Sequence, residues 1–157
     1  MRITLIAISK TTEKYLQEGI AIYENRLQHY CKFQRVEIPD LKNSKNLSFE
    51  QQKLKEAELI LSKVSNTDFV VLLDENGKEF NSLQLSKEIN KWMNQSISNV
   101  IFIIGGPYGF DQSVYNRANL KISLSKLTFS HQMVRLFFVE QIYRSFTILK
   151  GEPYHHQ

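Results

Sequence analysis

Apolar runs of strand length recur along the chain, and amphipathic stretches of helical length separate them. The unbroken runs over residues 69–73 and 100–104 are typical of central parallel strands that are covered on both faces. Between the runs, apolar residues return every three or four positions, which indicates helices that bury one face. The predicted strands cover 1–8, 33–38, 69–73, 100–104 and 120–124, and the predicted helices cover 12–29, 49–64, 83–93 and about 131–150. This alternation predicts a parallel α/β sheet.

Polar residues at the ends of these segments indicate helix starts and turns. Ser9 and either Thr11 or Thr12 are expected to cap the first helix, because their side-chain oxygens can accept hydrogen bonds from its first backbone N–H groups. Ser82 is expected to cap the third helix in the same way. Residues 74–82 (DENGKEFNS) predict a turn-rich connection that leads into that helix.

The last predicted helix is apolar on two sides. Its first stripe consists of Phe138, Val139, Ile142, Phe146 and Leu149, and its second patch consists of Met133, Val134, Phe137 and Ile148. One face of a sheet cannot cover both sides of a helix, so we expect a second copy of the chain to cover one of them and form a homodimer. The alternative is a central helix within one small domain.

The composition fits one ordinary domain, which we expect to span residues 1–157. Hydrophobic residues make up 42% of the chain, which is enough for a buried core. Twenty Lys and Arg residues against 16 Asp and Glu give a formal net charge of +4. This mild basic excess permits RNA or another polyanion as a partner and does not require one.

Residue counts argue against several classes of protein. The one cysteine, Cys31, allows no internal disulfide, and together with the lack of a signal-peptide pattern it leads us to expect a reducing, cytoplasmic setting. No apolar run approaches the roughly 20 residues that a membrane span needs, so we expect no membrane association. The four histidines lack the spacing of metal ligands, and we expect no metal.

A glycine-rich turn directly follows the predicted strand 100–104. Gly105 and Gly106 end the strand, and Gly109 follows after Pro107 and Tyr108. Glycines at such a place let the backbone turn sharply and let a ligand approach bare N–H groups, although many glycine turns are only tight loops. The end of the other buried strand, at residue 73, should lie nearby, and ligand sites of parallel sheets gather at such strand ends. We therefore expect a ligand pocket here.

Two further features lie close to the start of the last helix. Residues 125–130 (SKLTFS) offer hydroxyls, backbone amides and one aromatic ring. We expect a loop that ends in a helix cap at Ser130, and such a loop can also supply backbone contacts to an adenine-like ring. Arg135 falls on the apolar stripe of the helix, where an unpaired guanidinium would be costly. It is expected to pair with a carboxylate such as Glu140, to pair with an acid from elsewhere, or to face an anionic ligand.

The C-terminal tail (GEPYHHQ) follows a defined helix end. Gly151 ends the last helix and Pro153 prevents the helix from continuing. A frayed end is one expectation for such a tail. We expect a docked tail here instead, because Tyr154 and His155 directly follow the constrained turn.

Several sequence blocks, taken together over the whole chain, resemble the RlmH family of SPOUT-class methyltransferases. The blocks are MRITLIAISK, LLDENGKEFNS, FIIGGPYGF, SLSKLTFSHQMVR and EQIYRSFTILKGEPYHH. The resemblance implies an α/β fold with a C-terminal trefoil knot and a cytoplasmic homodimer. It also implies methyl transfer from S-adenosylmethionine to N3 of a pseudouridine in helix 69 of 23S ribosomal RNA, within the assembled ribosome.

The resemblance also implies two groups of site residues in this chain. The residues expected to bind the cofactor are Leu73, Gly105, Leu124, Ser125, Lys126, Leu127, Thr128 and Phe129. Arg144, Tyr154 and His155 are expected near the target base: His155 as a candidate base, Tyr154 as a stacking or hydrogen-bonding partner, and Arg144 as a stabiliser of the anion. The alternative function is that of a non-catalytic RNA-binding factor in ribosome assembly, which would leave the glycine turn without a role.

Overall fold

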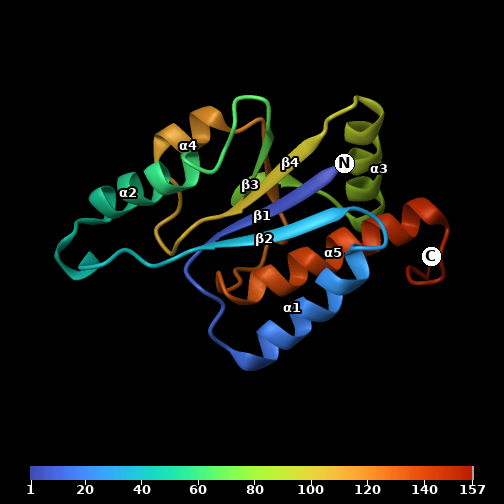
Figure 1. The fold of residues 1–157 in the computed structure, drawn as a ribbon, viewed down its shortest axis with the longest axis horizontal. Coiled ribbons are helices and arrows are strands. Elements are labelled where there is room, and N and C mark those ends of the chain that lie inside the picture. Colours follow the sequence, from blue (N-terminus) through green and yellow to red (C-terminus); the bar gives the residue numbers. More distant parts are fainter. Residues whose placement is uncertain (157) are drawn as a thin grey trace.

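A five-stranded parallel sheet lies between two layers of helices (Figure 1). The computed structural model describes residues 1–156, so Gln157, the last residue of the predicted domain, lies outside the described residues. The strands are β1 (Arg2–Ile8), β2 (Lys32–Ile38), β3 (Phe69–Glu79), β4 (Asn99–Ile104) and β5 (Leu120–Ser123). The helices are α1 (Lys14–Leu27), α2 (Phe49–Leu61), α3 (Ser82–Asn94), α4 (Gln112–Arg117) and α5 (Met133–Lys150), with a short 3-10 turn at Ser44–Asn46. The predicted parallel α/β class is confirmed; the pattern missed only the short helix α4.

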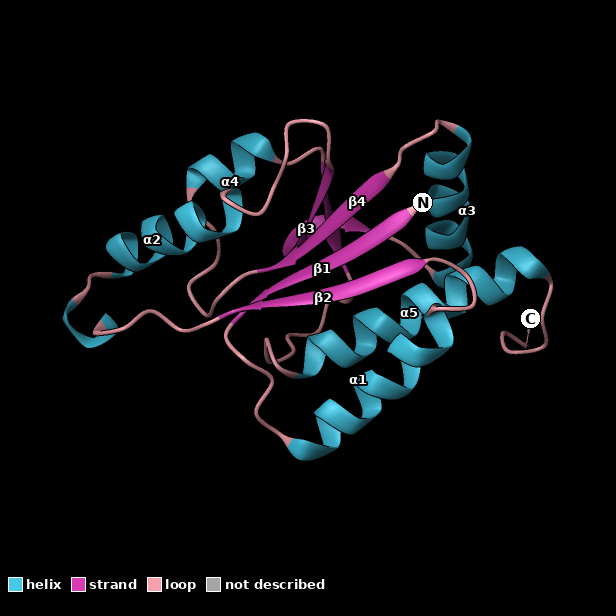
Figure 2. Ribbon diagram, in the orientation of Figure 1, coloured by secondary structure: helices cyan, strands magenta, loops and turns pink. Residues whose placement is uncertain are grey.

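The strand order is β2-β1-β4-β3-β5, and every pairing is parallel (Figure 2). The chain steps from β1 to β2 and from β3 to β4 through α1 and α3, which lie on one face of the sheet. It steps in the opposite direction, from β2 to β3 and from β4 to β5, through α2 and α4 on the other face. Opposite directions on opposite faces give all four crossovers one hand, as right-handed βαβ units require.

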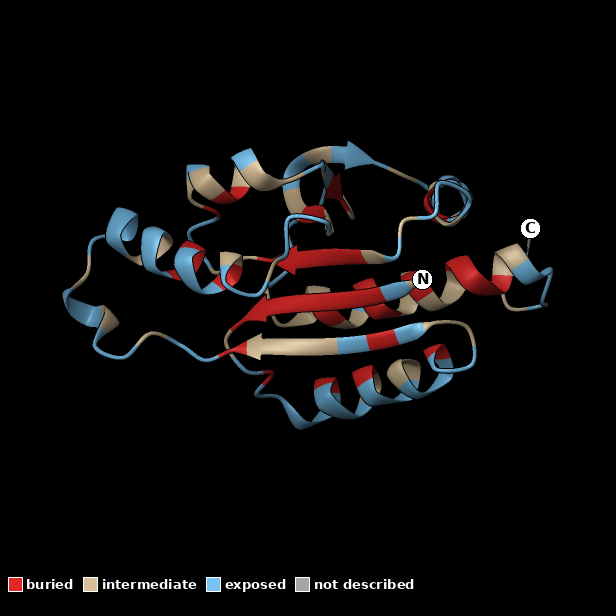
Figure 3. Cartoon of the chain, turned by 45° about the horizontal axis from the view of Figure 1, so that its top comes forward, coloured by how far each residue is buried: buried red, intermediate tan, exposed pale blue. Residues whose placement is uncertain are grey.

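Alternate residues of the strands enter two separate cores. In β1, Ile3 and Leu5 pack toward α1, α3 and α5, whereas Ile6 and Ile8 pack toward α2 and α4. The central strands are therefore buried along their length, while the outer sides of the helices are exposed (Figure 3). This two-sided burial explains why the central strands read as unbroken apolar runs rather than as alternating patterns.

Strand β3 continues past the end that the sequence predicts. Its register with β5 is interrupted between Leu73 and Lys78, and Ile122 of β5 pairs with both of these residues. The segment between them bulges out of the ladder, and the strand then resumes to Glu79. The prediction of a turn-rich connection from residue 74 was wrong for this part, because its backbone groups pair again with β5 after the bulge.

The first predicted helix cap is absent. The residue before α1 is Glu13, whose side chain makes no capping hydrogen bond. The backbone N–H of Thr12 instead donates to the side-chain oxygen of Gln132, at 3.1 Å. Ser9 has a left-handed backbone, with φ of 68°, and Thr11 is buried. Both are used by the site described below rather than by the helix.

The predicted cap of α3 is displaced by one residue. Asn81, not Ser82, caps this helix, and it forms a reciprocal capping box with Gln84. The side-chain oxygen of Asn81 accepts a hydrogen bond from the N–H of Gln84, the third residue of the helix. The hydroxyl of Ser82 is therefore free to donate to Gln141 of α5, at 2.8 Å.

Helix α5 packs between α1 and α3, and the predicted stripe of Phe138, Val139, Ile142 and Phe146 is buried against the sheet. The second patch is only partly covered within the chain, because Phe137 remains 42% exposed. The homodimer that this patch suggested stays a prediction. None of the helices between residues 1 and 156 is long and apolar enough to cross a membrane.

The bulge in β3 generates a test of the fold. A Cβ atom on Gly77 would lie 2.5 Å from the carbonyl carbon of Ile122 and 2.6 Å from its nitrogen, and neither backbone atom can move without breaking the ladder. We expect Gly77→Ala to lower the free energy of unfolding by about 2 kcal/mol, measured by denaturant titration. The control is Gly19→Ala in α1, whose new Cβ would meet only the mobile end of Leu136. Equal stability of the two variants would contradict this close packing.

Candidate functional site

The carboxyl ends of β3, β4 and β5 meet at one edge of the sheet and enclose a cavity. Leu73 pairs in register with Ile104 on one side and with Ile122 on the other, so the segments that follow β4 and β5 face each other. The cavity between them has a volume of about 660 Å³, within the usual range for small-molecule sites. Its shape arises from the strand register and not from any single loop.

Most of the residues predicted to bind a cofactor line this cavity. The seven that do so are Leu73, Gly105, Leu124, Ser125, Leu127, Thr128 and Phe129. Lys126 is the eighth; its side chain is not part of the lining, is 82% exposed and lies 3.9 Å from Glu79. The structure thus brings together residues that are about 50 positions apart in the sequence.

The glycine turn after β4 is shaped by packing within the chain. A Cβ atom on Gly105 would come within 2.9 Å of the ring of Phe110, and one on Gly106 would come within 2.8 Å of a carboxylate oxygen of Glu56. Gly109 has a φ of +78°, which favours glycine for conformational reasons, and its N–H donates to the carbonyl of Gly106. The three glycines therefore form a compact turn that brings backbone to the edge of the cavity.

The opposite wall is a loop held by two serine hydroxyls. Ser123 donates to the carbonyl of Ser125, and the Ser125 hydroxyl accepts from the N–H of Leu127; both distances are 2.9 Å. Within the described chain, the backbone N–H groups of Lys126, Thr128 and Phe129 donate to no other residue. They are available as donors to a bound molecule. Ser130 also holds the start of α5, because its hydroxyl accepts from the N–H of Met133.

The sequence analysis missed an acidic wall of the cavity. Asp74 and Glu75 are placed there by the bulge in β3. The hydroxyl of Tyr115, in α4, donates to Asp74 at 2.6 Å, and burial together with this bond raises the pKa of Tyr115 to about 12. Carboxylates at a cavity mouth suit a ligand with a positive charge. Its position directly after Leu73 could have indicated Asp74 as a cavity residue. The sequence predicted a turn from this residue on, however, and so gave no direction for its side chain.

Arg135 ties the start of α5 to the ends of β1 and β2. Its guanidinium is fully buried, and the acid that faces it is Glu37 of β2, at 3.4 Å, rather than Glu140. The other acceptors are the carbonyl oxygens of Ile8, Ser9 and His131 and the hydroxyls of Ser9 and Thr11. Of the three possibilities left open by the sequence, pairing with an acid from elsewhere is the one observed, and these bonds offset the cost of burial.

His131 lines the cavity just ahead of Arg135. Burial lowers the pKa of its imidazole, and the nearby positive charge of Arg135 lowers it further. Because the ordinary pKa of histidine is about 6.5, His131 is neutral at pH 7. Its ring therefore adds a hydrogen-bonding group to the cavity without adding a charge.

The C-terminal tail is docked on its own chain. The hydroxyl of Tyr154 donates to Glu140 at 3.0 Å and lies 3.2 Å from the hydroxyl of Tyr23 in α1. The guanidinium of Arg144 lies over the ring of Tyr154, 4.6 Å from its centroid, and donates to the same Glu140. The predicted docking of the tail is confirmed. Arg144 is not a solvated charge, because Glu140 compensates it.

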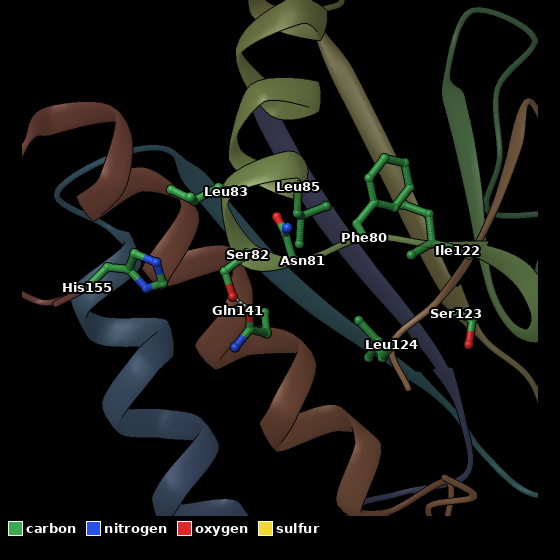
Figure 4. A pocket seen from close by; sticks show the side chains of 10 residues that line it. All are labelled: Phe80, Asn81, Ser82, Leu83, Leu85, Ile122, Ser123, Leu124, Gln141 and His155. Atoms are coloured by element: carbon green, nitrogen blue, oxygen red, sulfur yellow. Dashed lines mark hydrogen bonds between the residues drawn. The ribbon is translucent and has the colours of Figure 1, made fainter. Parts of the chain in front are cut away.

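A second, smaller cavity lies beside the tail. It has a volume of about 330 Å³, and His155 lies across it from Phe80 and Ile122 (Figure 4). Its wall at Ile122, Ser123 and Leu124 is shared with the larger cavity. Two chambers that meet at the end of β5 could hold two reactants on either side of one wall.

The orientation of His155 limits what its ring can do. Nη1 of Arg144 lies 3.4 Å from Nδ1 of His155, and arginine can only donate. Nδ1 is therefore the acceptor, and a neutral ring in this arrangement carries its proton on Nε2, which is buried without a partner among the described residues. In this arrangement His155 presents an N–H donor at Nε2. Over residues 1–156, no group of three or more His, Cys, Asp or Glu side chains could hold a metal ion.

Comparisons with known proteins agree on one family. A family model described as "Predicted SPOUT methyltransferase" matches residues 1–155. A protein of Christiangramia forsetii named ribosomal RNA large subunit methyltransferase H is 64% identical over 157 residues, which is the whole of both chains. A protein of the same name from Flavobacterium johnsoniae is 60% identical, again over the whole of both chains.

A solved structure supports the fold. The structure of a probable methylase family protein from Haemophilus influenzae matches 99% of this chain and 70% of its own, with a TM-score of 0.53. At 11% sequence identity, this likeness concerns the fold alone.

The Glu37–Arg135 contact leads to a prediction about acid stability. Burial alone would raise the pKa of Glu37, but hydrogen bonds from Thr11 and the charges of Arg35 and Arg135 outweigh it and lower that pKa. A carboxyl with a lowered pKa in the folded state stabilises the fold above its unfolded pKa, about 4.3, and this contribution is lost as the pH falls through the folded value.

We therefore expect Glu37→Gln to lower the free energy of unfolding by about 2 kcal/mol at pH 7 and to flatten its dependence on pH below about 4.5. Urea titrations at several pH values measure both effects. The control is Glu58→Gln on the exposed side of α2. A pH dependence in Glu37→Gln as steep as that of the wild type would contradict the role of this carboxylate.

Proposed function

The chain belongs to the RlmH family of SPOUT methyltransferases, and we propose that it methylates N3 of a pseudouridine in helix 69 of 23S ribosomal RNA, within assembled ribosomes. The methyl donor is S-adenosylmethionine. The observation that carries this proposal is the cavity at the ends of β3, β4 and β5, where seven of the eight residues expected to bind the donor line one space. A non-catalytic RNA-binding factor would have no use for such a cavity.

The residues of the larger cavity suit this donor. The backbone N–H groups of Thr128 and Phe129 can hold the edge of an adenine ring, and Leu73 and Leu124 can pack on its faces. The carboxylates on the bulge of β3 favour the positive charge of a sulfonium. When bound, S-adenosylmethionine supplies a methyl group that is already activated, so the chain's task is mainly to hold donor and acceptor in line.

The tail residues provide the acceptor side. N3 of the base becomes a good nucleophile only when its proton leaves, and the resulting negative charge spreads onto the neighbouring carbonyl oxygens. We assign to Nε2–H of His155 a hydrogen bond to such an oxygen, which stabilises this charge, while the N3 proton passes to solvent. Arg144 holds the ring of His155 in the donor orientation, and Tyr154 holds Arg144 through stacking and through their shared partner Glu140.

The proposal includes a cytoplasmic homodimer and a knotted C-terminal segment. The uncovered apolar side chains of Tyr15 and Ile22 on α1 and of Phe137 on α5 support the dimer, because all three are more than 40% exposed. The knotted segment is proposed because the chain matches the SPOUT methyltransferase family model over residues 1–155.

The reaction is tested by mass mapping of ribosomal RNA. Ribosomes from a strain that lacks the gene, incubated with the purified protein and S-adenosylmethionine, are expected to gain one methyl group on the helix 69 pseudouridine. Ribosomes that lack the pseudouridine should gain none. Equal methylation of both kinds of ribosome would contradict the assigned substrate, and no methylation of either would contradict the proposed function.

The same assay tests the role of His155. We expect His155→Ala to lower kcat about 100-fold, since the loss of one donor to a developing oxyanion typically has this effect. His155→Gln should retain a larger share of the activity, because its amide still donates. If His155 were a base, both variants would lose activity equally. The rise of activity with pH that the wild type shows would then be absent from the pH profiles of both variants.

The dimer is tested by sedimentation equilibrium. The wild-type protein is expected to have twice the mass of one chain, and Phe137→Arg should shift it toward the monomer by placing a charge in the interface. Leu83→Arg, at an exposed residue of α3, is the control and should leave the mass unchanged. A monomeric wild type would contradict the proposed dimer.

A further inference from the structure

Two aromatic side chains form an exposed stack on the face of the sheet that carries α2 and α4. Phe49 begins α2, and Tyr108 lies in the glycine turn after β4. Their ring centroids are 4.1 Å apart and their planes are inclined by 24°. Phe49 is nevertheless 62% exposed and Tyr108 is 43% exposed. The stacked pair therefore presents a large aromatic surface to a partner.

Both rings are held by rigid backbone. Phe49 directly follows Ser48, which caps α2 in a reciprocal capping box with Gln51. Tyr108 lies between Pro107 and Gly109 in a turn that is closed by a hydrogen bond. Because neither backbone segment is free to turn away, the outer surface of the stack is preorganised for a flat partner.

The stack is continuous with the larger cavity, and positively charged lysine side chains lie near it in the sequence. Tyr108 also lines the cavity, whereas Phe49 does not, so the stack extends outward from the cavity rim. Residues 42–55 contain four lysines and one acidic residue, Glu50, which is paired with Lys53 at 2.8 Å. Lys42, Lys45 and Lys55 are exposed and form no ion pair among the described residues. A strand of RNA offers both a flat base and the negative charge that these lysines attract.

We infer that Phe49 and Tyr108 form a stacking platform for an unpaired nucleobase of the RNA substrate. This inference rests on the proposed function and adds a contact outside the two cavities. The platform holds the RNA by stacking on the open side of Phe49, and the lysines before and within α2 bind the adjoining phosphates. A second copy of the chain is the other possible occupant, but the uncovered apolar patch on α5 and α1 lies on the opposite face of the sheet.

Phe49 is the residue to change, because it takes part in the stack without touching the cavity. Phe49→Ala removes the outer ring, and Phe49→Trp retains a stacking surface. Leu54→Ala removes another exposed apolar side chain, 50% exposed, from a different side of α2. Each variant is compared with the wild type in KM for unmethylated ribosomes, in direct binding to these ribosomes by co-sedimentation, in Kd for S-adenosylmethionine by calorimetry, and in its sedimentation mass.

We expect Phe49→Ala to raise KM and the Kd for ribosomes about tenfold, which corresponds to about 1.4 kcal/mol, with the Kd for the methyl donor and the mass unchanged. Phe49→Trp and Leu54→Ala should remain close to the wild type. Unchanged ribosome binding in Phe49→Ala, equal weakening in Phe49→Trp, or a change of mass in Phe49→Ala would each overturn the inference; the last would indicate that a second copy covers the stack. A wild type that binds ribosomes but does not methylate them would contradict the proposed function and not the platform. The comparison of ribosome binding between Phe49→Ala and the wild type would still test whether Phe49 and Tyr108 bind a nucleobase.

Discussion

The double pairing of Ile122 with β3 is the constraint on which the site depends. Because Leu73 and Lys78 both pair with this one residue of β5, the four residues between them must leave the ladder. That bulge supplies the acidic wall of the larger cavity, and the end of β5 supplies the wall that the two cavities share. The requirement for glycine at position 77 follows from the same contact, since the two backbones lie too close for a side chain. The pairing of β3 with β5 at Ile122 thus shapes both this part of the fold and the site.

The N-terminal part of α5 is the second fixed point. Arg135 donates to acceptors at the ends of β1 and β2 and to His131, so the loop before α5 cannot move independently of the sheet. At the other end of this helix, Glu140 and Arg144 hold Tyr154 and His155. One helix therefore positions both the loop that precedes it and the tail that follows it, which explains why residues with such different chemistry alternate along its surface.

The sequence pattern predicts the sheet and its main helices because burial on two faces leaves unbroken apolar runs. It fails where tertiary contacts override local preference. Residues 74–79 have turn chemistry, yet pairing with β5 makes part of them a strand. Ser9 and Thr11 look like caps, yet they accept hydrogen bonds from Arg135, more than 120 residues away. The resemblance to the RlmH family identified residues that the structure brings into one cavity, but Asp74, Tyr115 and His131 emerged only from the geometry, as did the contact of His155 with Arg144 and the stack of Phe49 on Tyr108.

The central claim is that a methyl donor binds at the carboxyl ends of β3, β4 and β5. The most direct measurement is a titration of isotopically labelled protein with S-adenosylhomocysteine, followed through the NMR shifts of the backbone amides. The account predicts the largest shifts at Gly105 and at the amides of residues 124–129. Shifts confined to residues 80–85, beside the smaller cavity, or no saturable shifts at all, would contradict it.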